Sequence, residues 1–264
     1  MTQRSKFWLI TLAAMLGVGL TLSLGRWQLS RAAQKEDLQL AIETQGRRSA
    51  LLNADLIGAQ RASAGPNPTS QAGRADDGAA LIHRRVQLRG TWATANTVFL
   101  DNRQMDAKPG FYVVTPLRLQ DSAQVVLVQR GWVQRDFQDR TRLPTIQTPP
   151  GLVEIHGRIA LPPAKLVNLG PDGQGPIRQN LDMTAFANET GLALLPVSMV
   201  QTNEPLVGPA QNDGLLRNWP VPASGASKNY GYAAQWFALS ALIGVLYGWL
   251  GLIKPRMNPV NPHA

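Results

Sequence analysis

The sequence contains no cysteine among its 264 residues. Without a thiol the chain can form neither a disulfide nor a thiolate zinc or copper(I) site, and CxxC redox chemistry is excluded. The absence is compatible with an oxidising compartment. The three histidines, His83, His156 and His263, lie far apart and form no metal-binding spacing such as HExxH. The sequence therefore offers no candidate metal site.

Acidic residues are also few. Lysine and arginine number 26 against 17 aspartates and glutamates, which gives a net charge of +9. Nine arginines lie between positions 84 and 142. This excess is compatible with a solvated sheet face, anionic lipid headgroups, an acidic protein partner or the propionates of a haem. Nucleic acid is not indicated as a partner, because the arginines alternate with predicted strands and no nucleic-acid-binding motif is present.

Catalytic motifs are missing as well. The chain has no nucleophile elbow, phosphate-binding loop or dinucleotide fingerprint. Asp101 and Asp106 lie in or near predicted turns, where aspartate is common, so they make a weak glycosidase-like pair. We predict that the protein is not an enzyme and that it has no catalytic residues. A membrane-tethered hydrolase is the alternative from another class.

Long apolar runs are present, one near each end. Phe7–Leu24 has eighteen residues and Tyr232–Ile253 has twenty-two, and neither run contains a charge. Runs of this length can cross the hydrocarbon core, and tryptophan and tyrosine residues lie near their ends, as at membrane interfaces. We predict two transmembrane helices with tails at residues 1–6 and 254–264. A cleaved signal peptide ending near Ser23–Gly25 is the alternative for the first run.

Small residues recur at helical spacing in both runs. They are Ala13, Gly17 and Thr21 in the first run, and Ser240, Gly244 and Gly248 in the second. Such faces favour close helix packing, either between the two runs or with a partner helix. Two spans place both termini on one side of the membrane and residues 25–231 on the other. Basic residues flank both sides equally, so charge does not fix the orientation.

The chain that follows the first run predicts two further segments. Leu29–Gln45 is an amphipathic helix, with Leu29, Leu38 and Ile42 on its apolar side, and it is expected to continue from the membrane helix. Residues 58–80 are rich in Gly, Pro, Ser, Ala, Asn and Asp, which is typical of a flexible loop.

The stretch Val98–Gln134 predicts the middle of an antiparallel sheet. It holds three strand-like runs, with a tight turn expected at Lys108–Gly110. Val125–Val128 is a continuous β-branched and aliphatic block, so it should be a buried central strand. Gly131, between Arg130 and Trp132, indicates a bulge or a close backbone approach.

Further strands are expected at Leu81–Trp92, Leu152–Ala160 and Pro196–Thr202, with His83 as a surface strand residue. Asp182 and Gly191 are expected to cap a short helix over Met183–Thr190. The predicted fold class is α+β. Two transmembrane helices flank a mainly antiparallel β domain, barrel-like or sandwich, with one or two helices and spanning residues 25–231.

Six motifs in order resemble the surfeit locus protein 1 family. They are Gly25-Arg26-Trp27-Gln28 with Arg31 and Lys35, Asp101-Asn102-Arg103, Gly110–Leu119 with Thr115-Pro116-Leu117, Leu127–Val133, Leu216-Arg217-Asn218-Trp219-Pro220, and Tyr232–Leu239. The resemblance covers nearly the whole chain apart from residues 58–80 and the tail.

The resemblance implies an assembly factor for haem-copper cytochrome c oxidase. Its partners would be membrane lipid, oxidase subunit I, whose maturation it would aid, and other assembly factors. Family members are similar to two-span proteins of the bacterial cytoplasmic membrane or the mitochondrial inner membrane. For this chain we expect the bacterial inner membrane, a periplasmic central domain and cytoplasmic termini.

The resemblance also implies two sets of site residues. The haem- or partner-binding set is Gly25, Arg26, Trp27, Gln28, Arg31, Asn229, Tyr230, Tyr232, Gln235 and Trp236. The structural set is Arg103, Gly110, Pro116, Arg130, Gly131 and Trp132.

Haem a is the one cofactor that the resemblance implies, because some bacterial members are implicated in binding and presenting it. The family's haem-binding proposal uses a histidine three residues before the tyrosine that here is Tyr232. Asn229 stands at that position, and asparagine is a poor iron ligand. Two mechanisms remain open. One is a haem a carrier whose propionates meet Arg26 or Arg31, and the other is a scaffold without haem.

Overall fold

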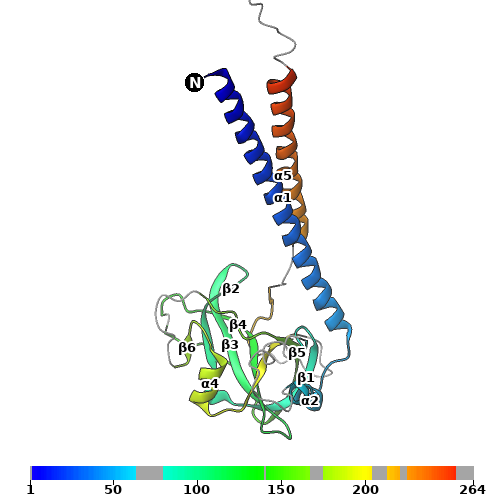
Figure 1. The fold of residues 1–264 in the computed structure, drawn as a ribbon. Helices are drawn as coiled ribbons and strands as arrows, with labels where there is room; N and C mark the ends of the chain where they lie inside the picture. Colours follow the sequence, from blue (N-terminus) through cyan, green and yellow to red (C-terminus); the bar gives the residue numbers. More distant parts are fainter. Residues whose placement is uncertain are drawn as a thin grey trace, which may run out of the picture. The chain divides into compact units, whose positions relative to one another are not determined.

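The computed structural model describes residues 2–63, 80–139, 141–166, 175–203, 213–220 and 225–253. The chain divides into two compact units. The helical unit comprises Met1–Leu40 and Val221–Ala264, and the barrel unit comprises Ala41–Pro220. Figure 1 shows the helices and strands of both units.

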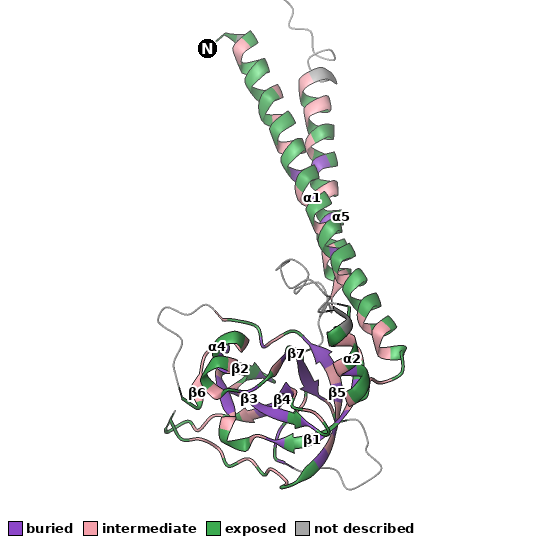
Figure 2. Cartoon of the chain, turned by 60° about the horizontal axis from the view of Figure 1, so that its bottom comes forward, coloured by how far each residue is buried: buried purple, intermediate pink, exposed green. Residues whose placement is uncertain are grey.

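Two long helices form the helical unit. α1 covers Gln3–Arg47, and α5 covers Ala226–Tyr247 and continues as a π-helical turn over Gly248–Ile253. Both are long and apolar enough to cross a membrane, with mean hydropathies of 2.0 and 1.4 over their most apolar windows. α1 is uninterrupted, so the predicted amphipathic helix is continuous with the first predicted span, as expected. Figure 2 shows that most of the surface of both helices is exposed.

The two helices pair with each other, as the sequence led us to expect. The side-chain oxygens of Thr11 and Tyr247 lie 2.8 Å apart. A Cβ atom placed on Gly25 would lie 2.6 Å from the ring of Phe237, so the absence of a side chain lets the helices approach. This pairing is intramolecular.

The predicted small-residue face of the second span is only partly used in this pairing. Ser240 is buried. A Cβ atom added at Gly244 or Gly248, however, would meet nothing within 4 Å in the part of the chain that the structure describes. The four-residue spacing alone overestimated the contact. Large side chains such as Phe237 and Tyr247 make much of it instead.

A closed sheet forms the barrel unit. Its strands are β1 (Arg85–Trp92), β2 (Val98–Met105), β3 (Lys108–Leu119), β4 (Val125–Gln134), β5 (Leu152–Ala160), β6 (Ile177–Arg178) and β7 (Leu194–Gln201). The order is β1-β5-β7-β4-β3-β2-β6, and β1 also pairs with β3. β1, β5, β7, β4 and β3 therefore close a ring. The β4–β7 and β2–β6 pairs are parallel and the others antiparallel, which confirms a mainly antiparallel, barrel-like domain.

The largest core cluster fills this ring, because its buried side chains come from all five ring strands. Leu56 of α2 (Asn53–Ser63) adds to it. A second cluster packs Phe186 of α4 (Met183–Thr190) against the other face of β4, at Leu127. β4 is thus buried on both faces, which explains its continuous apolar run and confirms it as a central strand.

The predicted turn at Lys108–Gly110 is wrong. The hairpin between β2 and β3 turns at Asp106 and Ala107, whose φ angles are 50° and 61°. A two-residue hairpin turn of this kind requires positive φ at both positions, and alanine gives no sequence signal for it. β3 instead begins at Lys108, and Pro109 pairs with Gln104 inside the ladder.

Two other expectations need correction, and one is confirmed. Residues 58–63 of the predicted flexible loop are the second half of α2, while residues 64–79 lie outside the described residues. His83 is in a turn before β1, with φ of 71°, and not in a strand.

α4 is capped as predicted: Asp182 accepts hydrogen bonds from the amides of Thr184 and Ala185, and Gly191 adopts the left-handed conformation.

Candidate functional site

A polar cluster joins α1 and α5 near the start of α5. The amide nitrogen of Asn229 donates to Oε1 of Gln28 at 2.7 Å. Nζ of Lys35 donates to Oδ1 of Asn229 at 2.8 Å and to the carbonyl of Gly225 at 3.5 Å. Both ends of the Asn229 amide are therefore engaged. We call Gln28, Lys35 and Asn229 the interhelical cluster.

A second cross-helix contact lies one residue further along α5. The hydroxyl of Tyr230 donates to the carboxylate of Glu36 at 3.0 Å. Together with the interhelical cluster, it gives the pair of helices a polar junction next to the apolar part of α5. Hydrogen bonds between polar side chains add to the packing that holds two membrane helices together.

The other helical residues suggested by the resemblance lie outside this cluster. Gly25 is buried against Phe237. Arg31 stays on α1, with its guanidinium 5.9 Å from the ring centre of Trp27. The exposed members of the set are Arg26, Trp27, Arg31, Tyr230, Tyr232 and Gln235, and Trp236 is half-buried. The structure thus brings Gln28 and Asn229 together and leaves most of the set facing outward.

Axial haem ligation by histidine or cysteine does not fit these residues, which leaves a tyrosine such as Tyr230 as a weaker ligand. The described part of the helical unit contains neither histidine nor cysteine. At the position where the family proposal places a histidine, Asn229 is held by Gln28 and Lys35. The described residues also contain no group of three or more His, Cys, Asp or Glu side chains that could hold a metal ion.

In the barrel unit, Arg130 forms the centre of a buried charged cluster. β3 pairs Val113 with Gly131 and Val114 with Gln129, so Arg130 is the extra residue of a β-bulge. A bulge re-aims the side chain of its extra residue. The Arg130 side chain is 2% exposed, and its guanidinium lies 4.7 Å from the ring centre of Trp92.

One carboxylate serves two arginines in this cluster. Asp213 Oδ2 lies 3.4 Å from Nη2 of Arg130 and 2.5 Å from Nη2 of Arg217. Burial lowers the pKa of Arg130, and the nearby Asp213 carboxylate acts in the opposite direction and favours the charged form. Nη1 of Arg130 also donates to the hydroxyl of Thr148 at 2.7 Å, so a neutral acceptor binds the guanidinium in addition to the carboxylate.

These contacts fasten residues 213–220, the barrel-bound segment, onto the sheet. Leu216 and Trp132 exchange backbone hydrogen bonds of 2.7 and 2.8 Å. Nε of Arg217 donates to the carbonyl of Arg130 at 2.7 Å, and Nε1 of Trp219 donates to the carbonyl of Gln201 at 2.7 Å. The segment ends only five residues before Gly225, the N-cap of α5.

The glycines of the structural set explain how this segment fits. A Cβ atom at Gly131 would lie 2.7 Å from Cβ of Leu215, so only glycine lets the segment approach β4. A Cβ atom at Gly110 would collide with the ring of Trp132 and the carbonyl of Val133. Both glycines therefore serve close backbone approach, as predicted for Gly131.

The remaining members of the structural set also act within the barrel unit. The carbonyl of Arg103 accepts a hydrogen bond from Nε1 of Trp132 at 2.9 Å. Nη2 of Arg103 donates to the carbonyl of Gln179 at 3.0 Å. Pro116 pairs with Leu127 in the β3–β4 ladder. Burial lowers the pKa of Arg103, which is only 6% exposed.

Sequence reasoning missed Asp213, which belongs to the barrel-bound segment. It is 5% exposed, and its role depends on a bulge in β4 more than eighty residues away. The only local signal is that Asp213 precedes Gly214, which is typical of any turn.

The chain combines a closed, barrel-like sheet with two helices long and apolar enough to cross a membrane, the architecture of a candidate membrane protein with a β domain. The family model described as the SURF1 family matches residues 15–241, from the first candidate span through the barrel into the second. The chain belongs to this family, which is generally linked to cytochrome c oxidase assembly. A "SURF1-like protein" of Monosiga brevicollis is 29% identical over 170 residues, which are 63% of this chain and 53% of that protein. The chain thus spans about half the length of this curated relative.

Proposed function

We propose that the protein is a membrane-anchored assembly factor for haem-copper cytochrome c oxidase that aids maturation of subunit I. The family match carries this proposal, because it covers the barrel unit and part of each candidate span. In the proposed arrangement, α1 and α5 cross the bacterial inner membrane, the barrel unit lies in the periplasm and both termini are cytoplasmic. Other assembly factors and membrane lipid are further partners.

We propose that the protein acts by holding a partner and not by turnover. Two of its carboxylates illustrate the support for this view. Asp213 is paired with two arginines, and Glu154 binds Arg89, Gln87 and His156. A general acid or base exchanges a proton with substrate, whereas the oxygens of these two carboxylates are engaged by structural partners. A hydrolase is correspondingly less well supported.

A scaffold without axial haem ligation is the form of the proposal that these residues favour. Asn229 lacks an imidazole, and its amide is used between the helices. The alternative, delivery of haem a, would require a ligand from a partner or a weaker ligand such as Tyr230. The two forms differ in what co-purifies with the protein.

A strain lacking the gene tests the proposed function. We expect its membranes to lose cytochrome c oxidase activity and haem a absorbance, and a plasmid copy to restore both. Unimpaired oxidase in that strain, with no second family member present, would contradict the proposal. The protein purified in mild detergent from cells that make haem a should carry an oxidase subunit. A stoichiometric Soret band that survives washing would favour haem delivery over the scaffold.

A further inference from the structure

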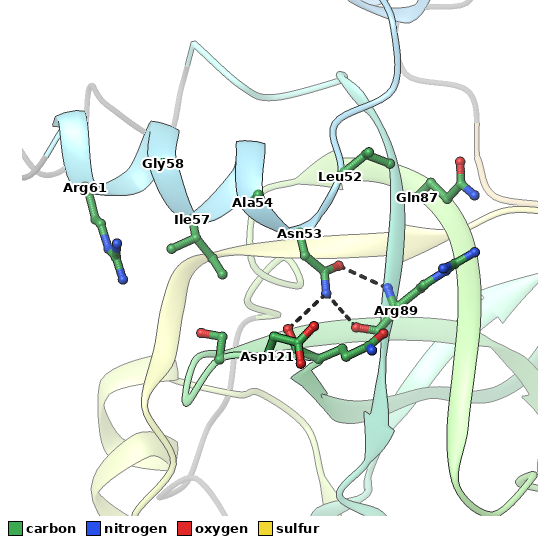
Figure 3. A pocket seen from close by; sticks show the side chains of 11 residues that line it. Leu52, Asn53, Ala54, Ile57, Gly58, Arg61, Gln87, Arg89 and Asp121 are labelled. Atoms are coloured by element: carbon green, nitrogen blue, oxygen red, sulfur yellow. Dashed lines mark hydrogen bonds between the residues drawn. The ribbon is translucent and has the colours of Figure 1, made fainter.

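A pocket of about 710 Å³ opens on the barrel unit beside α2 (Figure 3). Residues of α2 and the preceding Leu52 line one side, and the outer face of β1 and the β3–β4 turn line the others. The volume lies within the range of about 300–1,000 Å³ that is typical of sites for small molecules or several side chains. It is far larger than a single ion requires. The pocket shares no residue with the interhelical cluster or with the buried cluster of Arg130, Asp213 and Arg217.

The pocket is preformed, because hydrogen bonds tie its walls together. Nδ2 of Asn53, the first residue of α2, donates to the carbonyl of Arg89 at 2.8 Å, and Oδ1 accepts from the amide of Arg89 at 3.0 Å. Nδ2 also lies 3.5 Å from the carbonyl of Gln120 in the turn. Figure 3 shows these three bonds meeting at Asn53. A site that is already ordered binds more tightly, because less free energy is spent on ordering its side chains and loops when the ligand binds.

One wall of the pocket is apolar. It is formed by Leu52, Ala54, Ile57 and Gly58. Leu52 is 51% exposed, although neighbouring Leu56 is fully buried in the barrel core. An exposed leucine in a concave wall favours an apolar ligand group, since burial against it removes both surfaces from water.

The rim carries two unpaired charges of opposite sign. The side chains of Arg61, near the end of α2, and Asp121, in the β3–β4 turn, make no ion pair or hydrogen bond with any residue that the structure describes. The side-chain amide of Gln120 is similarly free within the described residues. Arg89 differs, because its Nε is bound to Glu154 at 2.5 Å. The pocket therefore offers a cation, an anion and an amide around an apolar wall.

We propose that this pocket binds a short peptide segment of a partner protein. An apolar side chain packs against Leu52 and Ile57, a neighbouring acidic residue pairs with Arg61, and a basic residue pairs with Asp121. The Gln120 amide can both donate to and accept from a peptide bond. Phosphate-bearing ligands, whether lipid or nucleotide, fit less well because they would face the Asp121 carboxylate. The identity of the partner as an oxidase assembly protein rests on the proposed function.

A photocrosslink in living cells tests the proposal with the full chain. The photoreactive residue p-benzoylphenylalanine is placed at Ala54 in the pocket. The matched control has the same residue at Ala95, an exposed alanine outside the pocket. We expect irradiation to join position 54, and not position 95, to one defined segment of an oxidase subunit or assembly protein identified by mass spectrometry. Leu52→Asp should lower the yield by about tenfold, because it removes the apolar contact.

A second variant tests the charge assignment. Arg61→Glu should lower the same crosslink, whereas Arg118→Gln, a change of another exposed arginine of the barrel unit, should leave it unchanged. Leu52, Arg61 and Arg118 are all exposed, so unchanged protein levels are expected.

The outcomes separate this proposal from the proposed function. A product within the chain itself, a lipid adduct or no product at position 54 would overturn the peptide site, even if the deletion strain loses its oxidase. If the deletion strain keeps its oxidase but position 54 joins a defined segment of another protein, the peptide site stands and the oxidase assignment fails.

Discussion

Arg130 and Asp213, eighty-three residues apart in the chain, meet inside the barrel unit with Nη2 and Oδ2 3.4 Å apart. Both side chains are almost fully buried, and Arg217 binds the same carboxylate. The relationship links the bulge in β4 to the barrel-bound segment. The motifs Leu127–Val133 and Leu216–Pro220 therefore bind each other, although they lie far apart in the sequence. The second of them ends five residues before Gly225, the N-cap of α5.

Loss of the shared carboxylate should therefore be costly. Asp213→Asn leaves Arg130 and Arg217 buried without their counter-charge, and the removal of one partner from a buried ion pair costs about 3–5 kcal/mol. We expect this decrease in the free energy of unfolding of the full chain, measured by chemical denaturation in mild detergent. Glu189→Gln breaks the more exposed pair with Arg178 and should cost less than about 1 kcal/mol. Equal effects of the two variants would show that the buried cluster is not structural.

Glu154 makes barrel stability depend on pH. The hydrogen bond from Arg89 is the main cause that lowers the pKa of Glu154, with bonds from Gln87 and His156 adding to it and partial burial opposing it. A carboxyl whose pKa is lower in the folded state stabilises the fold above its unfolded pKa of about 4.3. That stabilisation is lost as pH falls through the folded pKa.

The test compares the thermal unfolding of wild type and Glu154→Gln at several pH values. We expect wild type to be more stable at neutral pH and the difference to disappear in acid below the folded pKa, where both side chains are uncharged. A difference that stays constant with pH would mean that shape, and not charge, sets the role of Glu154.

Gly25 controls how closely the two helices approach. Gly25→Ala would place a Cβ atom 2.6 Å from the ring of Phe237, and overpacking of this kind costs about 1–3 kcal/mol. We expect oxidase activity to fall while the amount of protein in the membrane stays unchanged. Gly19→Ala is the matched control, because a Cβ atom there meets nothing within 4 Å.

A second-site change makes this prediction specific. Phe237→Leu removes the ring that the new methyl group would strike, so it should restore activity to Gly25→Ala. If Gly19→Ala is as harmful as Gly25→Ala, or if Phe237→Leu gives no rescue, the effect does not come from helix approach.

The sequence predicted elements best where one local rule decides. Asp182 and Gly191 fixed the ends of α4, and the apolar block Val125–Val128 indicated a central strand, because capping and burial act within a few residues. The turn at Asp106 and Ala107 was missed because alanine seldom adopts positive φ and therefore carries no turn signal.

The candidate sites were harder to predict because distant residues form them. The motif residues Gln28 and Asn229 are 201 positions apart, and only the folded helix pair shows that they bond to each other. The sequence did not predict the pocket beside α2. Asn53 and Gln120 are common types of surface residue, and residues 58–63 were expected in a loop and not in a helix. Close approach at Gly131 could be foreseen, but not that Leu215 would be the neighbour.

The orientation of the chain in the membrane can be tested with reporters fused after Ala264. If both termini are cytoplasmic, a fluorescent protein at this position should fluoresce and alkaline phosphatase should be inactive. Phosphatase inserted after Ala123, in the exposed β3–β4 turn of the barrel unit, should be active. The reverse pattern would place the barrel in the cytoplasm and contradict the proposed localisation.

Substitutions of Asn229 and Gln235 test whether the start of α5 serves the pairing of the two helices or binds a partner protein. Asn229→Ala removes the partner of Gln28 and the main acceptor of Lys35, whereas Gln235→Ala changes an exposed side chain of the same helix. An interhelical hydrogen bond in a membrane contributes about 0.6 kcal/mol on average, so the protein should remain in the membrane. If helix register matters for function, Asn229→Ala should lower oxidase activity and Gln235→Ala should not. If instead this end of α5 contacts a partner directly, Gln235→Ala should be the more harmful change, and co-purification of the oxidase subunit should fall with it.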